Sequence, residues 1–270
     1  MTALTPRERF RRAPESLLLY AVSDDAWLGE RTLASCCAQA VRGGATFLQL
    51  RAKRATTKEL ISAYAEIRDE LEREGLAGKV PFVIDDDVEA ALAVGADGVH
   101  VGQSDESCAS ARARLGEGAI VGVSAQTVEQ ALAAQAAGAD YLGVGALFKT
   151  ATKPEAADVS LRTLQEICAA MSIPVVGIGG LNASTLASLA HTGVHGAAVV
   201  SAIFAAGDIV SATQDLRRIM DGVDLARVVA CERFEQRDNR LNGTEAGLLA
   251  SVFLRAPFPP LYPANCIMDA

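Results

Sequence analysis

The chain has 270 residues, of which 50% are hydrophobic and 21% charged, and its 25 basic and 33 acidic side chains give a formal net charge of -8. This composition is typical of a globular protein and excludes a disordered or fibrous chain. The sequence pI is about 5.0 and no basic cluster is present, which argues against nucleic acid or an anionic membrane as a partner, because phosphates require clustered Lys and Arg.

No apolar run approaches the roughly 20 residues that span a bilayer, and the first residues lack the apolar stretch of a signal peptide. We therefore expect a cytoplasmic protein without a membrane partner. The 6 cysteines show no Cys-x-x-Cys spacing and the 3 histidines are dispersed, so the sequence offers neither a disulfide framework nor a conventional zinc site. We expect the cysteines to be reduced packing residues.

Short apolar runs recur along the chain, and each is followed by a turn and then by an amphipathic stretch. The predicted strands are 17–22, 46–50, 81–84, 98–101, 119–124, 141–145, 174–179 and 196–201. The predicted helices are 31–41, 57–74, 88–94, 105–115, 128–137, 161–170, 184–191 and 209–220. Continuous hydrophobicity is typical of parallel strands covered on both faces, so the repeat predicts an α/β fold, a closed (β/α)8 TIM barrel. An open doubly wound sheet is the alternative, but the chain has no early Gly-x-Gly-x-x-Gly turn.

The repeat ends near residue 221, which divides the chain into an N-terminal extension (1–16), the barrel (17–221) and a C-terminal tail (222–270). The tail joins a charged stretch to a Pro-rich end, so we expect a C-terminal extension that is poorly ordered or drapes over the barrel, with no assigned role. The first dozen residues are expected to be similarly peripheral.

The ligand site of such a barrel lies at the carboxyl ends of the strands, and these ends are polar here. The second strand leads into Gln49, Arg51 and Lys53, which alternate along the chain and would point together toward the barrel mouth. The planar fork of an arginine and the ammonium of a lysine suit a diphosphate. The alternative is that both cations simply solvate a loop.

Carboxylates follow the next two predicted strands. Asp86 and Asp105 lie one β/α unit apart, and because adjacent strands are roughly 4.8 Å apart, both could reach one Mg²⁺ ion. Asp85, Asp86 and Asp87 also precede a predicted helix, so at least one of them is expected to cap it. Asp105 could be a helix cap as well.

A second anion site is predicted after the last two strands. Gly179 and Gly180 would let backbone N–H groups approach a phosphate, and Ser201 would begin a helix there, although a tight glycine turn is the alternative. The loop 150–154 would cover the mouth and exclude water. Together these strand ends predict two anionic ligands, one of them bound with Mg²⁺, and no His or Cys nucleophile.

Motifs at these same strand ends follow one another in a fixed order. They are Gln49-Leu-Arg-Ala-Lys53, GADGVHVGQSD at 95–105, GVS at 122–124, GADYLGVG at 138–145, Thr150-Ala-Thr-Lys-Pro154 and VGIGG at 176–180. In this order they resemble the thiamine phosphate synthase family, over about residues 17–221. The resemblance implies Mg²⁺-dependent transfer of an aminopyrimidinylmethyl group from its diphosphate to the ring nitrogen of a thiazole phosphate. Pyrophosphate would leave first, in a dissociative step, and thiamine phosphate would form.

The resemblance also implies roles for individual residues. Asp86 and Asp105 would bind Mg²⁺, and Gln49, Arg51, Lys53 and Lys153 would hold the diphosphate. Ser124 would lie near the pyrimidine and the leaving group, and the thiazole phosphate would contact Thr150, Thr152, Gly180, Val200 and Ser201. Asp85 stands where the family usually has Asn, so a third carboxylate replaces an amide beside the diphosphate. A homo-oligomer and a thiazole substrate that carries an extra carboxylate both remain open.

Two other functions are compatible with the predicted barrel. An isomerase acting on the thiazole precursor would share the fold and the phosphate site, but it would not need the diphosphate and metal residues Arg51, Lys53, Asp86, Asp105 and Lys153. A phosphate-ligand binding protein would result if Asp85 had abolished catalysis.

Overall fold

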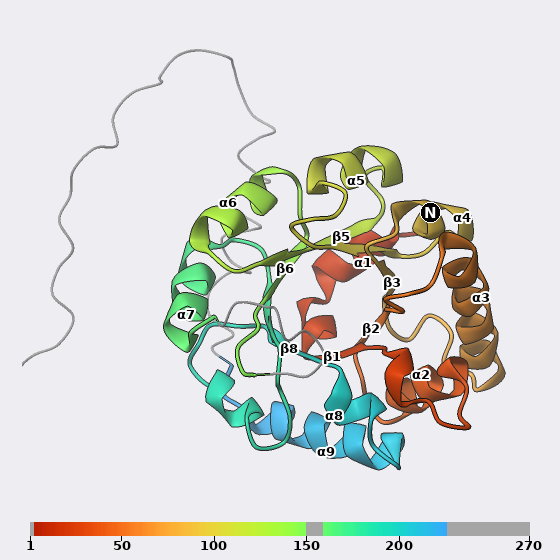
Figure 1. Ribbon diagram of the computed structural model, residues 1–270. Helices are drawn as coiled ribbons and strands as arrows, with labels where there is room; N and C mark the ends of the chain where they lie inside the picture. The colour runs from red at the N-terminus through yellow and green to blue at the C-terminus, as the bar shows by residue number, and fades with distance from the viewer. Residues whose placement is uncertain (1–2, 150–158, 226–270) are drawn as a thin grey trace, which may run out of the picture. The chain divides into compact units, whose positions relative to one another are not determined.

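Eight parallel strands form one closed barrel in the order β1 to β8 (Figure 1). The computed structural model describes residues 3–149 and 159–225. The strands are β1 (Leu19–Val22), β2 (Phe47–Leu50), β3 (Phe82–Asp85), β4 (Gly98–Val101), β5 (Ile120–Ala125), β6 (Tyr141–Val144), β7 (Val175–Ile178) and β8 (Gly196–Val199). The predicted TIM barrel is confirmed, and the pairing of β1 with β8 closes it, with Tyr20 opposite Ala198.

Helices surround the strands close to where the sequence predicts them, and the main differences are at α5 and at residues 184–191. They are α2 (Leu33–Arg42), α3 (Thr57–Arg73), α4 (Val88–Val94), α5 (Cys108–Leu115), α6 (Val128–Ala136), α7 (Leu161–Ala170) and α9 (Ile209–Gly222). Helix α5 begins later than predicted because Ser107, not Asp105, is its N-cap. The predicted helix 184–191 is only a 3₁₀ turn, Leu186–Leu189. Local hydrogen bonds compete with an α-helix there, since the side chain of Asn182 accepts from the Ser184 N–H.

The barrel has an inner and an outer core, and β2 shows how one strand contributes to both. Leu48 and Leu50 belong to the outer core between the strands and the helices, whereas Phe47 belongs to the inner core within the barrel. Side chains alternate between the two faces of a strand, and here both faces are buried. This is why the strands appear in the sequence as continuous apolar runs.

The N-terminal segment closes one end of the barrel. Helix α1 (Pro6–Arg12) follows a capping box formed by Thr5 and Glu8 and lies across the centre of the ring of strands in Figure 1. Its Phe10 is 2% exposed, belongs to the inner core, and lies 6.0 Å from Phe47 and 5.8 Å from Tyr141 between ring centroids. The expectation that the first dozen residues are peripheral is therefore wrong.

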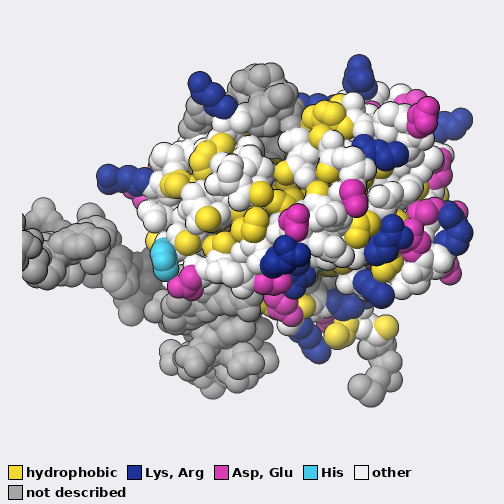
Figure 2. Space-filling view, turned by 90° about the horizontal axis from the view of Figure 1, so that it is seen from below, with side chains coloured by type: hydrophobic (Ala, Val, Ile, Leu, Met, Phe, Trp, Pro, Cys, Tyr) yellow, Lys and Arg dark blue, Asp and Glu magenta, His cyan; other side chains and the backbone are white. Residues whose placement is uncertain are grey.

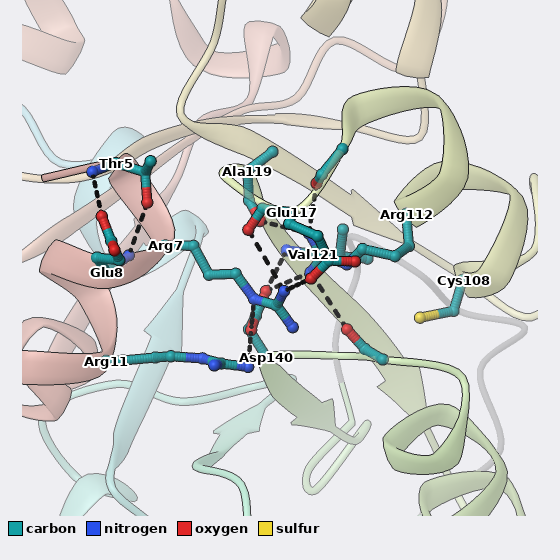
Figure 3. A network of polar contacts seen from close by, with 12 residues as sticks. Thr5, Arg7, Glu8, Arg11, Cys108, Arg112, Glu117, Ala119, Val121 and Asp140 are labelled. Carbon is teal, nitrogen blue, oxygen red and sulfur yellow. Dashed lines mark hydrogen bonds and ion pairs between the residues drawn. The ribbon is translucent and has the colours of Figure 1, made fainter. Parts of the chain in front are cut away.

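A buried ion network holds α1 at the amino-terminal ends of the strands (Figure 3). Asp140, which directly precedes β6, has a side chain that is 1% exposed. Its carboxylate accepts from Arg7 Nε at 2.7 Å and from Arg112 Nη2 at 2.5 Å, and the Val121 N–H donates to it at 3.0 Å. Charge-assisted hydrogen bonds of this kind satisfy a carboxylate that burial would otherwise destabilise.

On the face in Figure 2, acidic and basic side chains are interspersed. Within residues 3–149 and 159–225, no helix is long and apolar enough to cross a membrane. These residues all belong to the first of two units of the chain, Met1–Val228. The predicted tail (222–270) lies outside the described residues from 226 onward.

Candidate functional site

A cavity of about 400 Å³ opens at the carboxyl ends of the strands, opposite α1. Predicted site residues from β2, β3, β4, β5, β7 and β8 meet in it, namely Gln49, Arg51, Lys53, Asp85, Asp86, Asp105, Ser124, Gly180, Val200 and Ser201. The other predicted site residues, Thr150, Thr152 and Lys153, lie outside the described residues. Barrel closure therefore collects one site from segments that are distant in the sequence.

Arg51 is held by two carboxylates at the edge of this cavity. Its Nη1 donates to Asp24 Oδ2 at 2.9 Å, and its Nε lies 3.5 Å from Asp85 Oδ2. The side chain is only 12% exposed. These contacts fix the guanidinium in place before any ligand arrives, so Arg51 does not act as a solvated loop cation. Lys53 lines the same cavity.

Gln49 points into the barrel from β2 and is 3% exposed. Its Nε2 donates to Asp85 Oδ1 at 2.5 Å, and its Oε1 accepts from Tyr20 OH at 3.0 Å. The polar ends of its side chain are therefore engaged with protein groups in the floor of the cavity. Gln49 lines the same cavity as Arg51 and Lys53, as predicted. Its amide, however, forms hydrogen bonds with Asp85 and Tyr20 and does not extend toward the mouth.

The carboxylates after β3 divide into different roles. Asp87 is the N-cap of α4 and accepts from the Ala90 N–H, so the predicted cap is confirmed. Asp86 has a left-handed backbone with φ 61°, which is rare for a residue with a Cβ, and its N–H donates to the His100 carbonyl at 2.8 Å. This hydrogen bond holds the strained turn that places Asp86 on the cavity wall.

Asp105 lies on the same cavity wall, in the turn between β4 and α5. Its Oδ2 accepts from the Gly102 N–H at 2.9 Å. That hydrogen bond leaves the other carboxylate oxygen for a ligand or an ion. Asp86 and Asp105 thus supply carboxylate oxygens from neighbouring loops to one cavity, as the sequence predicts.

The glycine turn after β7 is tight. Gly180 has φ +68°, and a Cβ there would lie 2.7 Å from Phe148 Cβ and 2.8 Å from the Phe148 carbonyl oxygen. Glycine is therefore required both by the backbone conformation and by the close approach of the loop after β6. After β8, α8 (Ser201–Phe204) begins at the cavity, with Val200 as its N-cap residue.

Four polar residues in or next to the cavity were not predicted from the sequence. They are Tyr20 on β1, Asp24 after it, His100 on β4 and Tyr141 on β6. Tyr20 and His100 line the cavity, whereas Asp24 and Tyr141 contact residues that line it. The tyrosine hydroxyls are 2.8 Å apart, His100 Nδ1 lies 3.0 Å from Tyr141 OH, and His100 Nε2 lies 3.0 Å from Ser124 Oγ. A polar ring inside an otherwise apolar strand is the signal that points to them.

Burial fixes the protonation of several of these groups. Burial and the neighbouring phenol raise the pKa of Tyr20 well above its ordinary value, and burial also raises the pKa of Tyr141. Both therefore stay neutral O–H groups that can each donate one hydrogen bond.

Burial likewise raises the pKa of Cys37 and raises that of Cys168 to about 12, so neither thiol is an activated nucleophile.

Comparisons with known proteins identify the family to which this fold belongs. A family model described as thiamine monophosphate synthase covers residues 19–203. The chain is 46% identical over 201 residues to the thiamine-phosphate synthase of Ruminiclostridium cellulolyticum, which covers 74% of this chain and 94% of that protein. It is 42% identical over 209 residues to the thiamine-phosphate synthase of Pyrococcus abyssi, with 77% and 97% covered.

A solved structure agrees with these sequence matches. The thiamine phosphate pyrophosphorylase from Pyrococcus furiosus superposes with a TM-score of 0.69 at 36% identity, and the match covers 77% of this chain and 97% of that one. The residues matched by the family model, 19–203, contain all eight strands and the residues that line the cavity. The chain belongs to the thiamine-phosphate synthase family of enzymes.

Proposed function

We propose that the cavity transfers the 4-amino-2-methylpyrimidin-5-ylmethyl group from its diphosphate to the ring nitrogen of a thiazole phosphate. The observation that carries this proposal is the meeting of Arg51, Lys53, Asp86 and Asp105 in one cavity with the glycine turn at Gly180. The cations and carboxylates suit a diphosphate bound with a metal ion, and the glycine turn suits a second phosphate. An isomerase would not need the cations and carboxylates that suit a metal-bound diphosphate.

The residues present fit Mg²⁺. This ion prefers oxygen ligands and is commonly held by one or two carboxylates together with waters and substrate phosphates. Asp86 and Asp105 provide two carboxylates, and the described residues contain no group of three or more His, Cys, Asp or Glu that would form a complete protein cage. Bound there with the diphosphate, Mg²⁺ would neutralise the negative charge that develops on the leaving group.

Bond breaking in this reaction needs charge stabilisation and not a nucleophilic side chain. The carbon–oxygen bond to the diphosphate breaks with its electron pair on the leaving oxygen, and the thiazole nitrogen then donates its lone pair to the pyrimidinylmethyl carbon. Arg51, which its carboxylate partners hold in place, and Lys53 stabilise the departing pyrophosphate. The protein otherwise orients two bound substrates.

Asp85 does not face the diphosphate as an uncompensated charge. One oxygen lies 3.5 Å from Arg51 Nε and the other accepts from Gln49 Nε2. Its negative charge is therefore partly offset by the guanidinium, which it shares with Asp24, and the repulsion of a diphosphate by this carboxylate is reduced. In this proposal the replacement of Asn by Asp is compatible with turnover.

The thiazole phosphate is proposed to bind between the two last strands. Gly180, Val200 and Ser201 line that side of the cavity, where the glycine turn and the start of α8 present main-chain groups. Thr150 and Thr152, with Lys153 toward the diphosphate, are proposed to complete the two anion sites. Separate anion sites allow both substrates to be bound at the same time.

Pyrophosphate release by the purified chain tests the proposal. With both substrates we expect release that requires Mg²⁺ and is matched by thiamine phosphate formation. Asp105→Ala should remove most of this Mg²⁺-dependent activity and leave thiazole phosphate binding intact. Glu106→Ala is the matched control, because that neighbouring carboxylate pairs with Arg114 at 2.7 Å. Thiazole phosphate binding without any pyrophosphate release would instead indicate a binding protein.

We also propose that the enzyme is cytoplasmic. The free cysteines Cys36, Cys37, Cys108 and Cys168 suit the reducing cytoplasm that the sequence predicts. Sedimentation of the purified chain would show whether it forms a homo-oligomer.

A further inference from the structure

A continuous series of hydrogen bonds crosses the floor of the cavity. It runs from Asp85 through Gln49, Tyr20, Tyr141 and His100 to Ser124, with donor–acceptor distances of 2.5, 3.0, 2.8, 3.0 and 3.0 Å. Both ends of the series line the cavity, while the tyrosine side chains between them are buried in the inner core. One set of side chains therefore links the carboxylate beside Arg51 to the hydroxyl of Ser124, which lines the same cavity.

Glycines on neighbouring strands make room for the rings of this series. A Cβ at Gly122 would lie 2.2 Å from Tyr141 Cζ, and a Cβ at Gly143 would lie 3.2 Å from His100 Cε1. The two rings thus occupy space that any larger residue on β5 or β6 would fill. Close packing of this kind keeps each hydroxyl and ring nitrogen in reach of its partner.

The chemistry of its first member fixes the direction of the series. Both oxygens of Asp85 face donors, Oδ2 opposite Arg51 Nε and Oδ1 opposite Gln49 Nε2, so Gln49 donates to Asp85 and must accept from Tyr20 through Oε1. The single hydrogen of Tyr20 is thereby used, and Tyr141 must donate to Tyr20. The single hydrogen of Tyr141 is then used as well, so His100 must donate from Nδ1. In a neutral imidazole the other nitrogen, Nε2, accepts, and Ser124 donates to it.

We propose that Asp85 orders the hydrogens of this series, so that His100 carries its proton on Nδ1 and Ser124 Oγ presents lone pairs to the ligand. Tyr20, Tyr141 and His100 are positioning residues in this scheme. Ser124 then accepts a hydrogen bond from an N–H donor, which is the exocyclic amino group if the ligand is the aminopyrimidine of the proposed function. The identity of the ligand rests on that function, whereas the direction of the series does not.

An asparagine at position 85 would reverse the series. Arg51 Nε faces Oδ2 and requires an acceptor there, so an amide would place its oxygen toward Arg51 and its nitrogen toward Gln49. Gln49 would then accept from residue 85 and donate to Tyr20, and every later donor would become an acceptor. His100 would carry its proton on Nε2 and donate to Ser124. The Asp85 of this chain therefore decides whether Ser124 offers an acceptor or a donor.

Nitrogen-15 NMR of the histidine rings in the ligand-free protein tests the direction. Above neutral pH we expect the Nδ1–H form for His100, and the His100→Asn spectrum identifies its resonances. His195 provides an internal reference of the opposite form, because its Nδ1 accepts from the Val175 N–H. The Asp85→Asn variant should convert His100 to the Nε2–H form. An Nε2–H form in the unaltered chain, or an unchanged tautomer in Asp85→Asn, would overturn the proposal.

Kinetics of tyrosine variants test the effect on the ligand. Tyr141→Phe keeps the ring and removes the acceptor for His100 Nδ1–H, so the KM for the pyrimidine diphosphate should rise by about three- to tenfold, the cost of about one hydrogen bond, with the KM for thiazole phosphate unchanged. Tyr64→Phe is the matched control, because this buried hydroxyl lies outside the cavity, 3.5 Å from the Phe82 carbonyl. Equal effects of the two variants, or a parallel rise of both KM values, would overturn the positioning role.

The two measurements separate this proposal from the proposed function. The tautomer of His100 is read without substrate, so it reports on the series even in a protein that releases no pyrophosphate. An Nδ1–H form together with absent turnover would contradict the proposed function alone. Normal turnover with the opposite tautomer would contradict the ordered series alone.

Discussion

Removing the carboxylate of Asp140 is expected to destabilise the barrel strongly. Its side chain is 1% exposed and binds Arg7 and Arg112, and the Arg112 side chain is itself 9% exposed (Figure 3). Asp140→Ala leaves a buried guanidinium without its counter-charge. Breaking a buried pair in this way costs about 3–5 kcal/mol. At roughly 2–4 °C per kcal/mol for a domain of this size, the melting temperature should fall by about 6–20 °C.

The Arg112 guanidinium cannot easily replace the lost carboxylate with other partners. Its Nη1 already donates to the carbonyls of Gly116 and Ala119, at 2.9 and 2.6 Å, and its Nε has no hydrogen-bond partner among the described residues. Movement toward solvent would break these main-chain contacts. An Asp140→Asn variant keeps the shape and one acceptor and should lie between the wild type and Asp140→Ala.

Thermal unfolding followed by circular dichroism measures the effect, with Glu117→Ala as the matched control. Glu117 pairs with the same Arg7, but its side chain is 83% exposed, so its loss should cost about 0–1 kcal/mol. Equal losses for Asp140→Ala and Glu117→Ala would refute the argument from burial. An Asp140→Ala protein as stable as the wild type would show that the network does not hold α1 in place.

Three further variants test other contacts. Phe10→Ala leaves a cavity in the inner core. It should lower the free energy of unfolding by about 3–5 kcal/mol, which denaturant titration would detect. Gly180→Ala puts a Cβ 2.7 Å from Phe148 Cβ at φ +68°, so the KM for thiazole phosphate should rise while Mg²⁺ dependence is kept. Burial lowers the pKa of His195 below 6.5, so its protonation favours the unfolded chain and stability falls as the pH drops from above 6.5 through the lowered value. His195→Gln should remove this part of the pH dependence of unfolding, and an unchanged profile would count against it.

The sequence shows which residues follow the ends of the strands. Arg51, Asp86 and Asp105 follow predicted strands, and they meet because parallel strands of one barrel all end at the same mouth. Their partners do not follow from this rule. Asp24 and Asp85 hold Arg51 only because β1, β2 and β3 are neighbours at particular registers.

The sequence alone determines the repeat and the residue types at the mouth, because hydrophobic periodicity and turn chemistry are local properties. Tertiary structure decides what fills the interior. Phe10 enters the inner core and Tyr20 meets Tyr141 across the barrel, although 121 residues separate the two tyrosines along the chain. Such contacts depend on closure of the barrel and on the space that Gly122 leaves. The hydrophobic periodicity of the sequence indicates neither of these.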